Sequence, residues 1–254
     1  MKSLSNRVAI VTGAGRGIGR SIAEAYIREG AKVVIAEINE QAGQEAAKKL
    51  GGAGAGAFYE KLDVSNLSEI NSFLSNVQKQ FGAINILVNN AAVTKALGFF
   101  DVTENDWDWM HRINAKGLFF LMQATAKIMK DQGEGRIINI ASIAGKGFSG
   151  TSNISYAASK GAVITMTRLA AHYLGEYSIN VNAICPGITR TELYEEVARG
   201  KKGEEFRKLV ETSVPLRREN TPGDIAELAV FLAGDGSRNV TGQSWNVDGG
   251  LMWD

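Results

Sequence analysis

Short apolar runs alternate with longer amphipathic segments along the chain, and this alternation constrains the fold more than any other feature. Two of the runs, Val-Ala-Ile-Val (8–11) and Ile-Leu-Val (86–88), are apolar at every position. Such runs are typical of strands buried on both faces of a sheet. Strands that alternate with helices form parallel sheets covered by helices on both faces. The sequence therefore predicts one doubly wound α/β domain over residues 1–254.

The same pattern gives the expected bounds of the elements. Strands are predicted at residues 8–11, 32–36, 57–62, 84–88, 136–140, 179–184 and 244–247. Helices are predicted at residues 20–29, from after the second strand to about 50, and at 67–81, 104–130, 156–173 and 222–233, with a glycine-rich loop at 51–56. The charged segment 189–212 breaks the rhythm. We interpret it as a helical flap over the site, and an ordinary surface excursion is the alternative.

Composition excludes several function classes. The chain has 28 basic and 27 acidic residues, so we expect neither nucleic acid nor an anionic membrane as a partner. Its one cysteine, Cys185, cannot form an internal disulfide, and the two histidines form no metal-ligand pattern. The first residues show no signal-peptide pattern, and no stretch is long and apolar enough to span a bilayer. We expect a cytoplasmic protein without a metal site.

A glycine-rich turn follows the first predicted strand and leads into a helix. Its glycines are Gly13, Gly17 and Gly19, with Arg16 between them. The spacing differs from G-x-G-x-x-G, whose last glycine would fall on Ile18. In a doubly wound sheet this turn binds the pyrophosphate of a dinucleotide, because glycines allow close approach and the helix N-terminus offers free N–H groups. A plain strand-to-helix connection is the alternative.

Acidic residues after the next two strands point to the adenosine half of such a cofactor. Glu37 ends the second strand, where a carboxylate accepts hydrogen bonds from ribose hydroxyls and repels the additional phosphate of NADP. Arg16 favours NADP instead, if it is not a pyrophosphate contact or a solvated side chain. We weigh Glu37 more heavily and predict NAD. Asp63 is placed to bond the adenine amino group beside Val64, and a capping role for Asp63 is the alternative.

A tyrosine and a lysine stand four residues apart at the start of a predicted helix. Tyr156 and Lys160 therefore share one helix face. An ammonium near a phenol lowers the phenol pKa from ~10, so that the tyrosine can exchange a proton with an alcohol or a carbonyl. A surface lysine beside a half-buried tyrosine is the alternative. Ser142, after the fifth strand, is placed to hold the substrate oxygen, and Asn114 to hold a water or open a helix turn.

Seven motifs together resemble the short single-domain short-chain dehydrogenases/reductases, over essentially the whole chain. They are residues 12–19, 89–92, Asn114, Ser142, 156–160, 186–187 and 246–250. The resemblance implies a Rossmann-like sheet of seven strands and a homotetramer. It implies that Asn114 holds a proton-relay water, Ser142 polarises the substrate oxygen, Tyr156 is the acid/base, and Lys160 binds the nicotinamide ribose. Two positions depart from the family pattern, Ala92 in place of a glycine and Thr189 in place of an aliphatic residue.

The candidate binding residues fall into three groups: those for the cofactor, those for the substrate and those of the variable pocket walls. The predicted cofactor-binding residues are Gly13, Arg16, Gly17, Ile18, Gly19, Glu37, Asp63, Val64, Asn90, Tyr156, Lys160, Pro186, Gly187, Thr189 and Thr191. The predicted substrate-binding residues are Ser142, Asn153 and Tyr156, although Asn153 also suits a turn. We expect variable pocket walls from residues 94–100, 145–153 and 189–206, with Phe148, Tyr194 and Phe206 as candidate apolar surface. Trp107 and Trp109 are assigned to helix packing.

Three functions are compatible with this site. The leading hypothesis is an NAD-dependent dehydrogenase of secondary alcohols or polyols, because NAD usually serves oxidation. The nearest alternative is an NADPH-dependent reductase of 3-oxoacyl thioesters, which Arg16 favours. A catalytically idle nucleotide-binding sensor or scaffold belongs to another class, and the complete set of four catalytic residue types argues against it.

Overall fold

Seven parallel strands form one sheet at the centre of the molecule, in the order β3-β2-β1-β4-β5-β6-β7. The computed structural model describes residues 2–150, 152–192, 194 and 201–253. The strands are β1 Val8–Thr12, β2 Lys32–Glu37, β3 Ala57–Lys61, β4 Ile86–Asn89, β5 Gly135–Ile140, β6 Ile179–Pro186 and β7 Ser244–Val247. This topology confirms the predicted doubly wound α/β fold.

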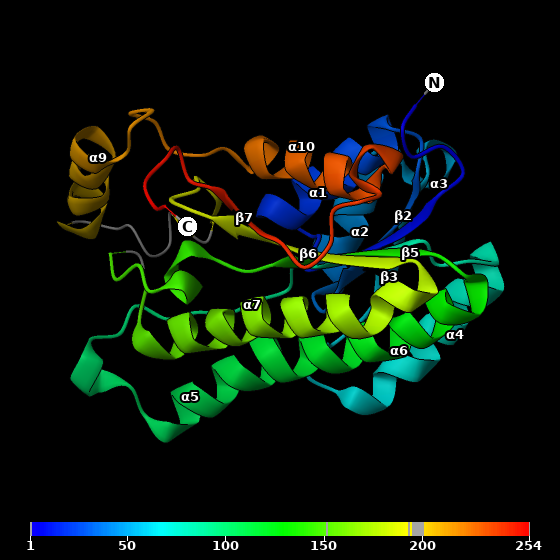
Figure 1. Ribbon diagram of the computed structural model, residues 1–254, viewed down its shortest axis with the longest axis horizontal. Coiled ribbons are helices and arrows are strands. Elements are labelled where there is room, and N and C mark those ends of the chain that lie inside the picture. Colours follow the sequence, from blue (N-terminus) through cyan, green and yellow to red (C-terminus); the bar gives the residue numbers. More distant parts are fainter. Residues whose placement is uncertain (1, 151, 193, 195–200, 254) are drawn as a thin grey trace.

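Helices cover both faces of the sheet (Figure 1). On one face lie α1 Gly17–Arg28, α2 Glu40–Lys49 and α10 Pro222–Ala233. On the other lie α4 Leu67–Phe81, α6 Leu118–Gln132 and α7 Ile154–Leu174. Along β1, Ala9 and Val11 pack on the first face while Val8 and Ile10 pack on the second. Because successive side chains point to opposite faces, a strand covered on both sides must be apolar throughout.

Further helical segments connect these elements. They are α3 Gly52–Ala55, α5 Glu104–His111, α9 Lys201–Ser213, and the 3₁₀ turns Phe99–Asp101, Ile143–Lys146, Gly175–Tyr177 and Asp235–Ser237. The prediction of a plain loop at residues 51–56 was wrong, because α3 forms one turn there between Gly51 and Gly56, both with φ +92°. No helix in the described part of the chain has the length and apolar character needed to cross a membrane.

The long helix predicted at residues 104–130 is interrupted. Between α5 and α6 runs a π-helical turn, Arg112–Gly117, which contains Asn114. The buried amide of Asn114 accepts a hydrogen bond from the N–H of Val93 (2.8 Å) and donates to its carbonyl (2.9 Å). Gly117 passes so close to Val64 that a Cβ would lie 2.4 Å from the Val64 carbonyl oxygen. These two contacts fix the turn against the loops after β3 and β4.

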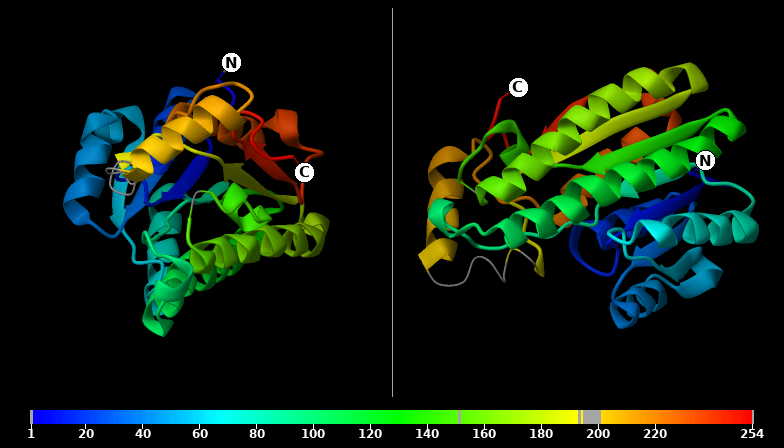
Figure 2. Two further views of the ribbon diagram at one scale, coloured as in Figure 1. Left: turned by 90° about the vertical axis from the view of Figure 1, so that its left-hand side faces the viewer. Right: turned by 90° about the horizontal axis from the view of Figure 1, so that it is seen from below.

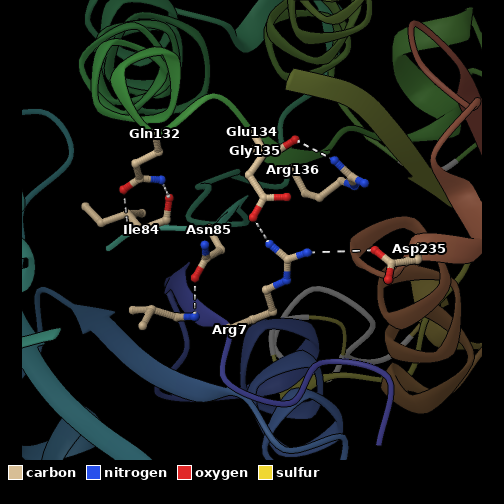
Figure 3. A network of polar contacts seen from close by, with 9 residues as sticks. Arg7, Ile84, Asn85, Gln132, Glu134, Gly135, Arg136 and Asp235 are labelled. Atoms are coloured by element: carbon tan, nitrogen blue, oxygen red, sulfur yellow. Dashed lines mark hydrogen bonds and ion pairs between the residues drawn. The ribbon is translucent and has the colours of Figure 1, made fainter. Parts of the chain in front are cut away.

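Polar contacts fasten the amino-terminal edge of the sheet (Figure 3). Arg7 forms ion pairs with Glu134 and, at 3.8 Å, with Asp235. Asn85 accepts from the N–H of Val8 (2.8 Å), and the amide of Gln132 bonds both backbone groups of Ile84. These side chains are occupied by the backbone and by one another, which assigns this edge a structural role.

The carboxyl-terminal edge is built differently, and Figure 2 (left) looks onto it. The loops after the strands, the start of α7 and helix α9 gather there (Figures 1 and 2). α9 lies within the flap predicted at residues 189–212, while residues 193 and 195–200 of that segment lie outside the described residues. In open α/β sheets ligands bind at this edge.

Candidate active site

A cavity of about 710 Å³ opens at the carboxyl-terminal edge of the sheet. Most of the predicted site residues line it, namely Gly13, Arg16, Gly17, Ile18, Glu37, Asp63, Val64, Asn90, Ser142, Tyr156, Lys160, Pro186, Gly187, Thr189 and Thr191. Gly19, Asn114 and Asn153 are absent from the lining. The structure therefore brings together side chains that are spread from residue 13 to residue 191 of the sequence.

The glycines of the first turn serve different purposes. A Cβ on Gly13 would lie 2.9 Å from Cα of Ala91, and one on Gly19 would lie 2.5 Å from both the Asn90 amide and the Gly13 carbonyl oxygen. Both positions need glycine because of packing against the β4 loop. Gly17 has φ +56° and begins α1, and a Cβ there would meet nothing closer than 3.5 Å. Its open surroundings and the free N–H groups of the first helical turn suit an anion.

The loop after β4 holds this turn in place. The amide of Asn90 donates to the carbonyls of Thr12 (2.9 Å) and Gly13 (3.1 Å). The Thr12 hydroxyl accepts from the N–H groups of Asn90 and Ala91 (both 3.0 Å). Asn90 lines the cavity, but its amide is bonded to backbone. The structure thus gives it a supporting position beneath the glycine turn.

Carboxylates stand at the ends of β2 and β3. Glu37 accepts from the N–H of Gly15 (3.1 Å) and from the N–H of Asn39 (3.1 Å), so its carboxylate is fixed at the cavity wall. Asp63 accepts from the N–H of Ser65 (2.8 Å) within the loop before α4, whereas the residue that caps α4 is Asn66. A glycine cradle at a helix N-terminus beside a fixed carboxylate fits the pyrophosphate and ribose of a nicotinamide dinucleotide.

Ser142, Tyr156 and Lys160 meet between β5 and α7. Asn153 caps α7 by accepting from the N–H of Tyr156 (2.9 Å), and the buried Ser142 follows β5. Ser142 and Tyr156 both line the cavity. The Lys160 ammonium is buried, donates to the carbonyl of Ile140 (2.6 Å) and lies 5.8 Å from the centre of the Tyr156 ring. The predicted helix face is therefore formed.

Burial dominates the protonation of this pair. It raises the pKa of Tyr156 to about 12, and the hydrogen bond from Ser142 acts in the opposite direction. Burial lowers the pKa of Lys160 to about 8. The expected lowering of the Tyr156 pKa is therefore not found in the protein alone, because burial of the phenol outweighs the opposing effect of Ser142.

Asn114 and Asn153 lie behind the cavity wall. Besides its bonds to Val93, the Asn114 amide donates to the Ser159 hydroxyl (3.1 Å), which in turn donates to the carbonyl of Tyr156 (2.7 Å). The Asn153 amide donates to the carbonyl of Lys95 (2.7 Å). Both asparagines hold the first turn of α7, which carries Tyr156. A relay water at Asn114 and substrate contact at Asn153 stay predictions.

The structure adds one residue that the sequence argument placed elsewhere. Trp109 lines the cavity, although it was assigned to helix packing with Trp107. Tyr194 and Phe206 line it as expected, while Phe148 packs instead against a core cluster that includes Ile143. Residues two apart on a helix point in nearly opposite directions, so the 107/109 spacing already separated the two tryptophans.

Comparisons with known proteins cover almost the entire chain. A family model described as "Enoyl-(Acyl carrier protein) reductase" matches residues 13–252. The crystal structure of a short-chain type dehydrogenase/reductase from Mycobacterium marinum superimposes with a TM-score of 0.91 at 32% identity, covering 99% of this chain and 98% of that one. The chain belongs to the short-chain dehydrogenase/reductase family. This confirms the resemblance drawn from the motifs.

Two curated relatives narrow the comparison within the short-chain dehydrogenases/reductases. Galactitol 2-dehydrogenase of Agrobacterium fabrum is 41% identical, over 97% of this chain and 98% of the relative. Sorbitol dehydrogenase of Cereibacter sphaeroides is 38% identical, over 97% and 98%. The protein is accordingly an NAD(P)-dependent dehydrogenase that acts on CH–OH groups.

The buried ammonium of Lys160 predicts a pH-dependent stability. Its folded pKa of about 8 lies below the ordinary 10.5, so up to pH 8 folding bears the full cost of burying the charge, and this cost disappears as the pH rises to 10.5. We expect wild type to gain roughly 2 kcal/mol of unfolding free energy relative to Lys160→Met between pH 7 and pH 10, measured by urea denaturation. The control is Lys48→Met at an exposed position, and we expect its difference in unfolding free energy from wild type to be the same at both pH values. A constant difference between wild type and Lys160→Met contradicts the assignment.

Proposed function

We propose that the protein oxidises a secondary hydroxyl group of a polyol or related alcohol with NAD, and that Tyr156 is its general acid/base. The observation that carries the proposal is that Ser142, Tyr156 and the buried Lys160 line one cavity at the carboxyl-terminal edge of the sheet. The names of the two curated relatives, galactitol and sorbitol dehydrogenase, support a polyol substrate.

The chemistry requires removal of a hydride from carbon and a proton from oxygen, which converts the alcohol to a ketone. The nicotinamide ring, when bound, supplies the hydride acceptor. Tyr156 accepts the proton from the substrate hydroxyl as the phenolate, after its own proton has left, and Ser142 holds the substrate oxygen by a hydrogen bond. Lys160, with a pKa of about 8, is mostly protonated at neutral pH and favours the phenolate as the proton is transferred. In this proposal a water near Asn114 passes the proton on, while the Asn114 side chain itself bonds Val93 and Ser159 and positions α7.

The cofactor preference follows from Glu37. Its carboxylate is held by two backbone N–H groups and cannot easily turn away from the cavity. An additional phosphate at the ribose would meet this negative charge, and the exposed side chain of Arg16 offers only a partial counterweight. NAD is therefore the proposed cofactor.

Apolar side chains exposed on two surfaces support the homotetramer that the family implies. Phe120 is exposed on α6, and Phe231 and Trp245 are exposed on α10 and β7. Exposed apolar patches are typical of protein–protein contact sites. We propose that these side chains lie in the subunit interfaces of the tetramer.

Replacing the tyrosine tests the mechanism. We expect Tyr156→Phe to lose turnover of the best alcohol in a polyol and secondary-alcohol panel by about 10³-fold or more while retaining NADH binding, because only the proton-exchanging hydroxyl is removed. NADH formation at 340 nm and fluorescence titration measure the two effects. Tyr173→Phe, an exposed position on the same helix, is the matched control. Near-normal turnover of Tyr156→Phe would refute the mechanism.

Replacing the carboxylate tests the cofactor. We expect wild type to prefer NAD, and Glu37→Ala to raise KM for NAD by about tenfold or more while lowering KM for NADP, because ribose hydrogen bonds and phosphate repulsion are both lost. Steady-state kinetics with both cofactors measure this, with Glu40→Ala, exposed on α2, as control.

A wild-type preference for NADPH, improved further by Glu37→Ala, would instead favour the 3-oxoacyl thioester reductase. Tight cofactor binding without turnover of any substrate would favour the idle sensor.

A further inference from the structure

One part of the cavity wall combines aromatic rings with hydroxyl groups. Trp109 from α5, Thr94 from the loop after β4 and Ser152 just before α7 all line it, together with Tyr194 and Phe206. The Tyr194 and Phe206 rings are stacked with centres 5.5 Å apart. None of these five side chains has a role in the proton chemistry proposed above, so they are free to contact another part of the substrate.

The Trp109 ring is in contact with a charged side chain. The Lys95 ammonium lies 5.2 Å from the centre of the indole ring and forms an ion pair with Asp106. Asp106 is buried and accepts from the Thr103 hydroxyl (2.7 Å) in the capping box of α5. A cation over an indole face is attracted by the ring quadrupole. The chain from Thr103 to Lys95 therefore fixes the orientation of Trp109.

The two hydroxyls are fixed by α7. The Thr94 and Ser152 hydroxyl oxygens lie 3.4 Å apart, and the Asn153 amide donates to Thr94 at 3.4 Å. A hydroxyl has one donor and two acceptor sites, so both groups keep hydrogen-bonding capacity toward the cavity. The Tyr194 hydroxyl, by contrast, donates to Glu219 (2.7 Å), which leaves its ring as the part available to a ligand.

We propose that Trp109, Thr94 and Ser152 form a subsite that selects an extended, polyhydroxylated carbon chain beyond the reacting carbon. Such a chain presents polarised C–H bonds that pack on the electron-rich face of an indole ring. Its hydroxyls exchange hydrogen bonds with Thr94 and Ser152. The inference deepens the proposed oxidation of alcohols and rests on it.

Trp107 provides a matched comparison within the same helix. It is 40% exposed, stacks on His111 with ring centres 4.4 Å apart, and is absent from the cavity lining. The two tryptophans therefore share helix, size and chemistry and differ in what they face. A change at Trp109 that reports the subsite must not appear at Trp107.

The test compares a hexitol with a short alcohol. We measure kcat and KM for sorbitol and for 2-propanol with wild type, Trp109→Ala and Trp107→Ala. For Trp109→Ala we expect kcat/KM for sorbitol to fall roughly 10- to 100-fold, mainly through KM, because the lost contact binds ground and transition states alike. Its kcat/KM for 2-propanol stays within about threefold, as do both values for Trp107→Ala.

Three further variants separate the subsite from a folding defect. Thr94→Val keeps the shape of the side chain and removes the hydroxyl, and we expect a selective loss on sorbitol. Lys95→Met removes the cation from the indole ring, and we expect a rise in KM for sorbitol that is smaller than in Trp109→Ala. Lys95→Arg keeps a cation at this position, so we expect its KM for sorbitol to stay near the wild-type value. NADH binding and the thermal midpoint verify that each variant is folded.

The outcomes distinguish the subsite from the proposed function. Equal losses on both alcohols, no loss in Trp109→Ala, or a wild-type preference for cyclohexanol over hexitols overturns the subsite while leaving alcohol oxidation intact. Failure of wild type to oxidise any alcohol overturns the proposed function itself.

Discussion

The hydrogen bond from the Lys160 ammonium to the carbonyl of Ile140 joins α7 to the end of β5. A charged group without exposure to water must be bonded, and here its acceptor lies at the carboxyl-terminal edge of the sheet. The bond therefore fixes the rotation and height of α7, and with them the position of Tyr156 one turn earlier. Ser142, two residues beyond Ile140, is brought to the same phenol. Burial in this arrangement lowers the pKa of Lys160 to about 8 and raises the pKa of Tyr156 to about 12.

The remaining polar side chains around α7 preserve this arrangement. Within the sheet, the buried Asn139 of β5 accepts from the Asn89 amide (2.8 Å) and donates to the Thr167 hydroxyl on α7 (2.9 Å). Asn114 connects the π-helical turn to the start of α7 through Ser159. Asn153, which caps α7, connects it to the loop after β4 through the carbonyl of Lys95. Buried polar groups that are fully bonded specify one packing arrangement, which a purely apolar interface does not. The substrate wall belongs to the same system, because Asn153 bonds both Tyr156 and the Thr94–Lys95 segment.

The sequence predicted those features that depend on periodicity and strand ends. Parallel strands bring their carboxyl ends to one edge, so Gly13, Glu37, Ser142 and Pro186 could be gathered into one site without coordinates. It offered an opened helix turn at Asn114 only as one of two roles, because the contacts of Asn114 with Val93 join residues 21 positions apart in the chain. It also misjudged the Tyr156 pKa, because burial depends on every neighbouring element, and it left Trp109 in the packing because the orientation of α5 is set by tertiary contacts.

The pH dependence of alcohol oxidation tests the central claim most directly. Because the phenolate of Tyr156 accepts the proton, kcat/KM for the alcohol at saturating NAD rises with pH and levels off above the pKa of the phenol. The Ser142 hydroxyl lowers that pKa, so Ser142→Ala moves the midpoint of the profile to higher pH in addition to slowing the reaction. A midpoint that stays in place or moves to lower pH in Ser142→Ala would contradict the account.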